Sequence, residues 1–145
     1  MTKEELKNKI SEIIPIATFD EAGEWLNVSI ETIDWLPLAW QLRANAELDF
    51  EFLFSVTAVD SKTHLTMVYH LRSIKHGHIV VVKAKCSRAN AEIESVCKIW
   101  KTAELNEREA YDLMGVKFLN HPDLRRLFLT DDWEGYPLRK DYVDE

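Results

Sequence analysis

Histidines give this chain its clearest potential for chemistry, and four of them, His64, His70, His76 and His78, lie close together in the sequence. His76 and His78 flank Gly77 at an expected hairpin tip, where two imidazoles could reach one metal ion. A protein metal site needs three or four ligands in fixed geometry, with further residues supporting them. No cysteine or carboxylate is placed to complete this set, so we expect no metal site.

His121 stands apart from that cluster and could carry a proton. It lies in a short run with Pro122 and Asp123, and nothing else in the sequence completes a catalytic arrangement around it. A structural role in a turn stiffened by Pro122 is the expectation.

The carboxylates Glu107 and Glu109 are poorly placed for joint acid–base chemistry, because residues two apart on a helix point to different sides. Glu109 suits the first turn of a helix. Glu107 shares a face with Ala110 and Met114, and we expect it to be buried and paired at an interface. No catalytic residue is predicted.

The two cysteines, Cys86 and Cys97, are too few for an iron–sulfur cluster or a structural zinc site. We expect both to be reduced core residues. The sequence holds no GxGxxG, Walker A or nucleophile-elbow motif, and its four glycines are too few to build a phosphate cradle. No cofactor is therefore expected in this chain.

Length and composition favour one globular domain: 145 residues, 46% of them hydrophobic, with a net charge of −7. The acidic balance and the lack of a basic stripe argue against nucleic acid and against anionic membrane surfaces. No apolar run is long enough to span a bilayer, and the charged amino end does not resemble a secretory signal. We expect the protein to be cytosolic, or to lie on the cytosolic side of a larger structure.

Periodicity predicts the elements of the first half. Thr2 and Glu5 form a capping box for a helix that Pro15 stops. Segments 16–19 and 25–31 predict a hairpin, and residues 34–47 predict a second helix.

Three strands follow, at 50–59, 65–71 and 79–86, and their short loops favour an antiparallel meander. In the first of them Phe50, Phe52, Phe54 and Val56 are expected on one face.

Two more helices are expected after the meander. One starts near Asn90 and buries Ile93, Val96, Cys97 and Trp100. The other runs from Asn106 to a C-terminal glycine, Gly115, and carries Arg108 and Asp112 as a pair on its outer face. The predicted fold class is α+β, a mostly antiparallel sheet with helices packed on one face and an irregular C-terminal tail. Residues 1–115 form the domain and 116–145 the tail.

The tail has no periodic pattern and is rich in Trp, Tyr, Arg and Asp, a composition typical of docking surfaces. Composition alone leaves two interpretations open. The tail docks onto a partner, or it folds back on its own domain and pairs its own charges.

A resemblance favours the first interpretation. Much of the sequence between residues 107 and 142 resembles the signature of the 30 kDa subunit family of respiratory complex I. The matching positions are Glu107–Glu109, Asp112, Gly115, Phe118, His121–Arg126, Asp132, Trp133, Gly135 and Pro137–Tyr142. Asn120 replaces a glycine common in the family, and asparagine tolerates a tight turn. Many members also carry a longer C-terminal extension that wraps neighbouring subunits, which this chain is not expected to provide in the same way.

The resemblance implies a non-redox structural subunit of the peripheral arm of an NADH-quinone oxidoreductase (translocase). Such a subunit packs chiefly against the large subunit that helps form the quinone site, and it touches the membrane only through the complex. Flavin and iron–sulfur clusters would lie in partner subunits, and the whole complex couples electron transfer to proton translocation. The residues assigned to the subunit interface are Glu107, Arg108, His121, Asp123, Arg125, Arg126, Asp132, Trp133, Tyr136, Arg139, Lys140, Asp141 and Tyr142.

Two alternatives remain at this stage. The chain could be the equivalent scaffold of a related membrane-bound hydrogenase or of a ferredoxin- or coenzyme-linked complex. It could also be an acidic interaction module unrelated to respiration.

Overall fold

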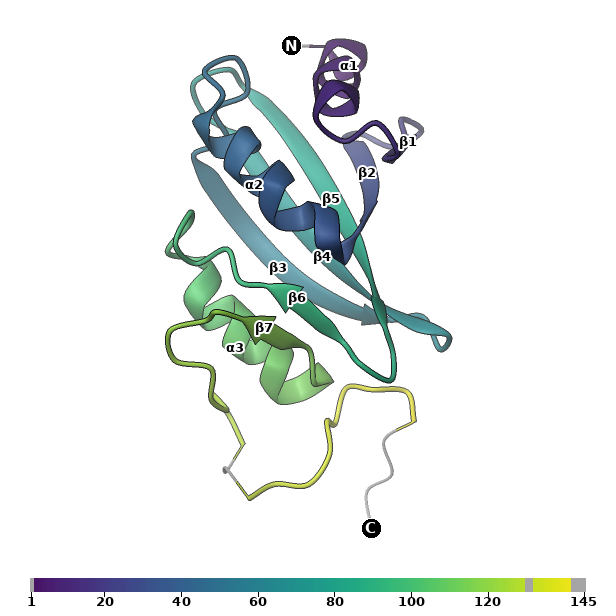
Figure 1. The fold of residues 1–145 in the computed structure, drawn as a ribbon, viewed down its shortest axis with the longest axis vertical. Helices are drawn as coiled ribbons and strands as arrows, with labels where there is room; N and C mark the ends of the chain where they lie inside the picture. Colours follow the sequence, from purple (N-terminus) through teal and green to yellow (C-terminus); the bar gives the residue numbers. More distant parts are fainter. Residues whose placement is uncertain (1, 130–131, 142–145) are drawn as a thin grey trace.

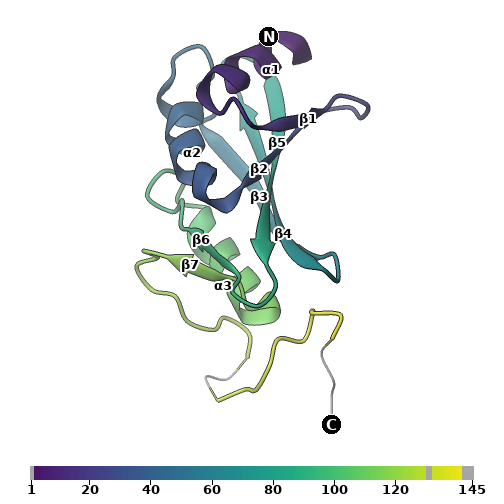
Figure 2. The same ribbon diagram turned by 45° about the vertical axis from the view of Figure 1, so that its right-hand side comes forward.

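A five-stranded sheet with helices on one face forms the body of the computed structural model, which describes residues 2–129 and 132–141 (Figures 1 and 2). The strands are β1 (Thr18–Asp20), β2 (Leu26–Glu31), β3 (Phe52–Asp60), β4 (His64–Ser73) and β5 (His78–Ser87). Their order in the sheet is β1-β2-β5-β4-β3, and every pair is antiparallel except β2 with β5. The predicted α+β class, the hairpin and the meander are confirmed.

The two N-terminal helices form where the sequence predicted them. Helix α1 (Lys3–Ile13) begins at Thr2, whose hydroxyl accepts a hydrogen bond from the Glu5 N–H at 3.2 Å. A short 3₁₀ turn, η1 (Thr32–Asp34), leads into α2 (Trp35–Ala44). Both helices bury apolar stripes against the sheet, in a core that includes Leu6, Ile10, Trp35, Leu38, Leu42, Met67, Tyr69 and Val82.

The prediction of a helix that starts near Asn90 is wrong. Residues Glu92–Glu94 form a short strand, β6, which pairs in parallel with β7 (Lys117–Leu119) in a second, two-stranded sheet. Ile93, Val96 and Trp100 are buried as expected. Their spacing reflects burial, and a partner strand at 117–119 provides the hydrogen bonds that a helix would otherwise supply.

Strand β3 also departs from its predicted pattern. A register shift between Leu53 and Ser55 breaks the alternation, so Val56 is buried while Phe52 and Phe54 are exposed. Phe50 is also buried, but it precedes the strand. A β-bulge inserts one residue and turns the following side chains to the other face.

Helix α3 (Ala103–Met114) begins one turn earlier than predicted and ends at Gly115, which has the expected left-handed conformation, with φ of +74°. A Cβ on Gly115 would lie 2.6 Å from the Tyr136 ring, so the glycine also admits the tail. Asn120, with φ of +63°, occupies the tight turn expected of it. Among the described residues, no helix is both long and apolar enough to cross a lipid bilayer.

Candidate functional site

The polar residues of the predicted interface gather around α3, which presents Glu107 to the β6 side and Arg108 and Asp112 to the tail. All three side chains are buried. The prediction that Arg108 and Asp112 form a pair on the outer face of the helix is therefore wrong, because the tail covers that face. Each of the two makes its own contacts with the tail instead.

Glu107 is the centre of a buried polar cluster. Its carboxylate accepts hydrogen bonds from the Ser95 hydroxyl at 2.5 Å and from the Val96 N–H at 3.0 Å. Burial raises the pKa of Glu107 to about 7, although these two donors work in the opposite direction. The cluster joins α3 to the turn that follows β6.

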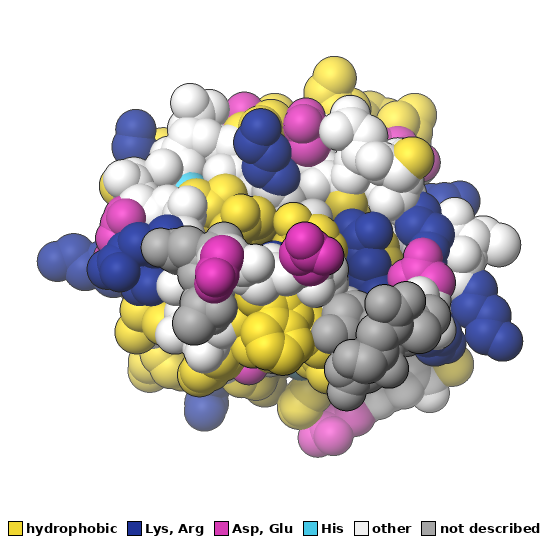
Figure 3. All heavy atoms as spheres, turned by 90° about the horizontal axis from the view of Figure 1, so that it is seen from below, with side chains coloured by type: hydrophobic (Ala, Val, Ile, Leu, Met, Phe, Trp, Pro, Cys, Tyr) yellow, Lys and Arg dark blue, Asp and Glu magenta, His cyan; other side chains and the backbone are white. Residues whose placement is uncertain are grey.

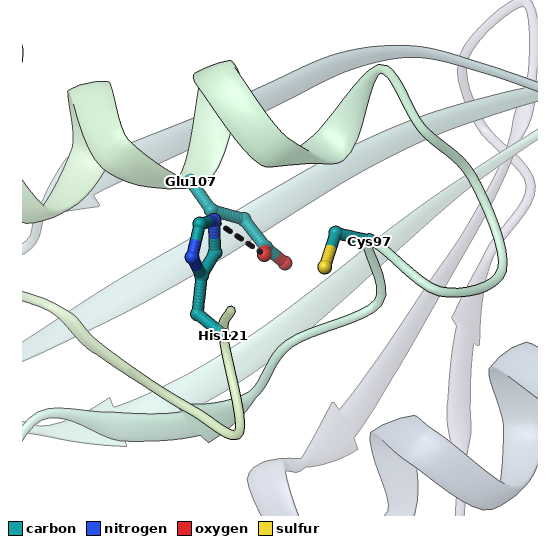
Figure 4. Close-up of side chains that lie close together, drawn as sticks. All are labelled: Cys97, Glu107 and His121. Atoms are coloured by element: carbon teal, nitrogen blue, oxygen red, sulfur yellow. Dashed lines mark ion pairs between the residues drawn. The ribbon is translucent and has the colours of Figure 1, made fainter. Parts of the chain in front are cut away.

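His121 reaches into the same cluster, with its Nε2 atom 3.9 Å from the Glu107 carboxylate (Figure 4). The Asp123 N–H donates to Nδ1 at 3.0 Å, so Nδ1 carries no proton. Nε2 must then be the protonated nitrogen, and it donates to the Glu104 carbonyl at 3.0 Å. Both ring nitrogens of His121 are thus engaged at the turn that Pro122 stiffens, in line with a structural role.

Cys97 completes a group of three possible metal ligands with Glu107 and His121, whose ligand atoms lie within 4.8 Å of one another. Sequence reasoning missed this group because the three residues lie on separate segments. A histidine that ligates a metal usually donates from its other nitrogen to an acceptor. In His121 the nitrogen nearer Glu107, Nε2, is the protonated one, and the other nitrogen, Nδ1, accepts a hydrogen bond instead of donating one. The Glu107 carboxylate is already bonded to two donors. The arrangement does not fit a metal site.

Asp112 anchors the start of the tail. Its carboxylate accepts hydrogen bonds from the backbone N–H groups of Leu127 at 3.2 Å, Phe128 at 2.6 Å and Leu129 at 3.1 Å, and from Arg126 at 3.1 Å. Burial alone would raise the pKa of Asp112, but these donors outweigh it and hold the pKa below its ordinary value. Four donors on one buried carboxylate form a rigid attachment.

Two arginines of the tail bond to main-chain carbonyls of the same chain. Arg126 donates to the carbonyls of Trp133 and Gly135, both at 3.1 Å, and lies 5.0 Å from the Tyr136 ring centre. Arg139 donates to the Met114 carbonyl at 2.6 Å and lies 5.3 Å from the centre of the same tyrosine ring. Arg108 supports this arrangement through the carbonyls of residues 125 and 126, both at 3.2 Å. The guanidinium groups hold the tail in shape.

A second attachment holds the far end of the tail and was not foreseen from the sequence. Arg88 pairs with Asp60 and with Asp141, the latter at 3.0 Å, and the Lys140 N–H donates to Asp60 at 2.6 Å. The Arg88 guanidinium holds the pKa of Asp60 well below its usual range. No local signal in the sequence could connect residues so far apart.

The remaining predicted interface residues lie on the surface of the tail. Asp123 and Arg125 form an exposed ion pair at 3.0 Å. Asp132, Trp133, Lys140 and Asp141 are exposed, and Tyr142 lies outside the described residues.

The tail also exposes large hydrophobic side chains: Phe128 is 63% exposed, Trp133 42% and Leu138 60%. Figure 3 shows this end of the molecule, where hydrophobic side chains lie uncovered among acidic and basic ones. Phe128 and Leu138 were absent from the predicted set, although each is an apolar residue within two positions of an arginine in a segment without periodicity, a pattern that could have indicated them.

Comparison with known proteins agrees with the resemblance seen in the sequence. Residues 28–145 match the family described as respiratory-chain NADH dehydrogenase, 30 Kd subunit. The C subunit of the NADH-quinone oxidoreductase of Chloroherpeton thalassium is 42% identical over 79% of this chain and 49% of its own length. That of Chlorobium phaeobacteroides is 43% identical over 78% of this chain and 70% of its own length. The chain thus spans between about half and seven tenths of these relatives.

A solved structure is also similar. One chain of a membrane-bound sulfane sulfur reductase, an archaeal respiratory membrane complex, superposes with a TM-score of 0.74 at 26% identity, covering 97% of this chain and 85% of that one.

Proposed function

Because the chain belongs to the 30 kDa subunit family of the respiratory-chain NADH dehydrogenase, we propose that it is a non-redox structural subunit of an NADH-quinone oxidoreductase. In this proposal it lies in the peripheral arm, on the cytoplasmic side of the membrane, and supports electron transfer from NADH to quinone coupled to proton translocation. The observation that carries the proposal is the tail, whose Arg126 and Arg139 bond to groups of the same chain while three large apolar side chains, Phe128, Trp133 and Leu138, are exposed. A surface held rigid from within and apolar outside suits permanent association with another protein.

The proposed partner of the tail is the large subunit that helps form the quinone site. Anchored loops lose little conformational entropy on binding, because the ordering cost has already been met in the free protein. The tail arginines therefore contribute indirectly, by presenting the apolar side chains, and the exposed Asp132, Lys140 and Asp141 provide a polar rim around them.

A second candidate is supported by the likeness to the sulfane sulfur reductase complex. The chain would then serve as the equivalent scaffold in a complex with a different electron donor or acceptor. Purifying the tagged chain from its native membrane and identifying the co-purifying subunits by mass spectrometry separates the two. An NADH-binding flavoprotein among them supports the first proposal, and its replacement by another electron-input subunit supports the second. Recovery of the chain alone would contradict both.

We expect Phe128→Ala to weaken assembly about tenfold or more while leaving the free chain equally stable. An exposed phenylalanine adds little to folding, whereas truncating a central hot-spot aromatic costs about 2 kcal/mol or more of binding, and about 1.4 kcal/mol already corresponds to tenfold. The measurement is the yield of co-purified complex, with urea unfolding of the free subunit alongside it. Ile33→Ala is the matched control, because Ile33 is 83% exposed and belongs to the short turn before α2 rather than to the tail. Equal assembly by both variants would remove Phe128 from the docking surface.

We also propose that this chain binds no redox cofactor or resident metal. His121 keeps its nitrogens in hydrogen bonds, and Glu107 is occupied by Ser95 and Val96. We expect visible absorption and elemental analysis of the purified subunit to show no stoichiometric chromophore or metal, and added Zn²⁺ to leave the melting temperature unchanged. A rise in melting temperature that Cys97→Ser abolishes would contradict this proposal.

A further inference from the structure

Strand β3 is an edge of the five-stranded sheet, since it pairs with β4 on one side only. At nine residues it is much longer than β1, the three-residue strand at the opposite edge. Long exposed edges offer unpaired main-chain groups to other strands, and proteins generally shorten, charge or cover them. Between Phe52 and Val59 this edge carries no charged side chain.

The hydrogen-bond pattern shows which residues of β3 face outward. The Ser61 N–H donates to the His64 carbonyl at 2.9 Å, so this pair closes the hairpin with β4. Bonded and non-bonded pairs alternate along an antiparallel ladder. With the register given by Val59 opposite Thr66, residues 55, 57 and 59 bond to β4, and Val56 and Ala58 direct their N–H and C=O groups away from it.

The N-terminal part of β3 provides an independent check of this assignment. Leu53 lies on the same face as Val56 and Ala58, and its carbonyl accepts a hydrogen bond from the Thr102 hydroxyl at 2.8 Å, on the outer side of the edge. Within the part of the chain that the structure describes, Val56 and Ala58 have no comparable main-chain partner on that side.

A groove of about 250 Å³ runs along these free groups. Residues 54–58 form one wall, and α3 and the tail form the other, chiefly through Ala110, Leu113, Met114 and Leu138. Phe52, Phe54 and Val59 are exposed beside it on the outer face of the sheet, at 43%, 38% and 45%. Free main-chain donors and acceptors along a trough with both apolar and polar lining match an extended polypeptide, whose side chains alternate between the trough and the outer face.

We propose that an extended segment of a neighbouring subunit adds to β3 as a sixth strand, bonding to Val56 and Ala58 and placing apolar side chains in the groove beside α3. This inference rests on the proposed function, because it requires a complex in which the neighbour is present. Leu138 lines the groove and belongs to the tail, so one partner can contact the tail surface and the β3 edge together. The exposed Glu109 at the groove wall favours a basic residue on the added strand.

The variant Ala58→Pro tests the added strand. Proline removes an N–H that points away from β4, and edge strands tolerate proline at such positions. We expect the free subunit to keep its fold by circular dichroism and its yield of assembled complex to fall about tenfold or more. Ala58→Ser is the matched control, because it keeps the N–H, and we expect it to assemble normally. Normal assembly of a folded Ala58→Pro subunit overturns the proposal.

Amide exchange gives a second readout, which uses the wild-type chain and therefore does not depend on whether the variant folds. In the wild-type subunit, the amides of Val56 and Ala58 should exchange about tenfold or more slowly in the assembled complex than in the free chain, since only there would they have acceptors. The amide of Thr57, already bonded to β4, serves as the internal reference. If exchange at Val56 and Ala58 is unchanged in a complex that contains the subunit, the proposal of an added strand is overturned, but the proposed function is not affected. If the free chain sediments as a dimer in which these amides are protected, the proposed strand from a neighbouring subunit is also overturned, and the β3 edge is assigned to a second copy of this chain.

Discussion

We expect Asp112→Ala to lower the free energy of unfolding by about 3–5 kcal/mol, the range for removing one partner from a buried charged network. The substitution leaves three backbone N–H groups of residues 127–129 and the Arg126 guanidinium without their acceptor. Each unsatisfied donor costs more than the bond itself contributed. Urea unfolding at neutral pH measures the loss.

Asp123→Ala is the control, because it removes an ion pair with Arg125 whose side chains are 51% and 63% exposed. Exposed pairs contribute less than about 1 kcal/mol. Equal stability of the two variants would contradict the anchoring role of Asp112. Amide exchange at Phe128 adds a local readout, since release of the tail alone would accelerate exchange there before the domain unfolds.

Low pH should weaken the stabilisation that Asp112 provides. The pKa of Asp112 is lower in the folded chain than in the unfolded one, so its stabilisation is complete above the unfolded value of about 3.9 and fades as the pH falls through the lower folded value. Asp112→Asn should therefore flatten the loss of stability at acidic pH. It should also unfold at a lower urea concentration than wild type at neutral pH.

Local patterns predicted the elements whose partners are near in sequence. The alternation of Leu26, Val28 and Ile30 indicated β2, and the capping residues Thr2 and Glu5 indicated α1. These features depend on backbone geometry within a few residues. The failure at residues 90–100 has a different origin. Ile93, Val96 and Trp100 have helical spacing, but the strand at 92–94 depends on Lys117–Leu119, and a sequence does not show which distant segment will supply a partner.

The candidate site was predicted in its residues but not in its interactions. The family resemblance assigned Glu107, Arg126 and Arg139 to a docking set, whereas Asp112 was expected only to pair with Arg108. Their burial and their bonds within the chain depend on where the tail crosses α3, which spacing along the helix could not reveal. Arg108 and Asp112, four apart, therefore suggested a surface pair although the tail covers both. Of the two interpretations of the tail, self-pairing describes these charges, and docking remains a prediction for the exposed Phe128, Trp133 and Leu138.

We expect Glu107→Gln to raise the free energy of unfolding at pH 8 by about 2–3 kcal/mol. Burial raises the folded pKa of Glu107 to about 7, whereas an unfolded glutamate titrates near 4.3. The folded chain therefore binds a proton that the unfolded chain has released, so wild-type stability should fall as the pH rises from about 4 to about 7. Without the charge, glutamine keeps one carbonyl acceptor, for the Val96 N–H, and its NH₂ group can donate to the Ser95 hydroxyl oxygen instead of accepting from it. Its amide meets the Nε2–H donor of His121, which reduces the gain below the full effect of the pKa shift.

The measurement is urea unfolding of wild type and Glu107→Gln between pH 5 and pH 8. The wild type should lose stability across this window, while the variant should lose markedly less. Glu104→Gln is the matched control, since Glu104 lies one turn earlier on α3 and is exposed, so its stability should follow that of wild type within about 0.5 kcal/mol. The groups that lie near Glu107 on other segments include His121, Cys97, Ser95 and Tyr69. If the variant and wild type share one pH profile, Glu107 is ionised throughout, and the turn after β6 is held to α3 by a charged carboxylate rather than by a protonated one.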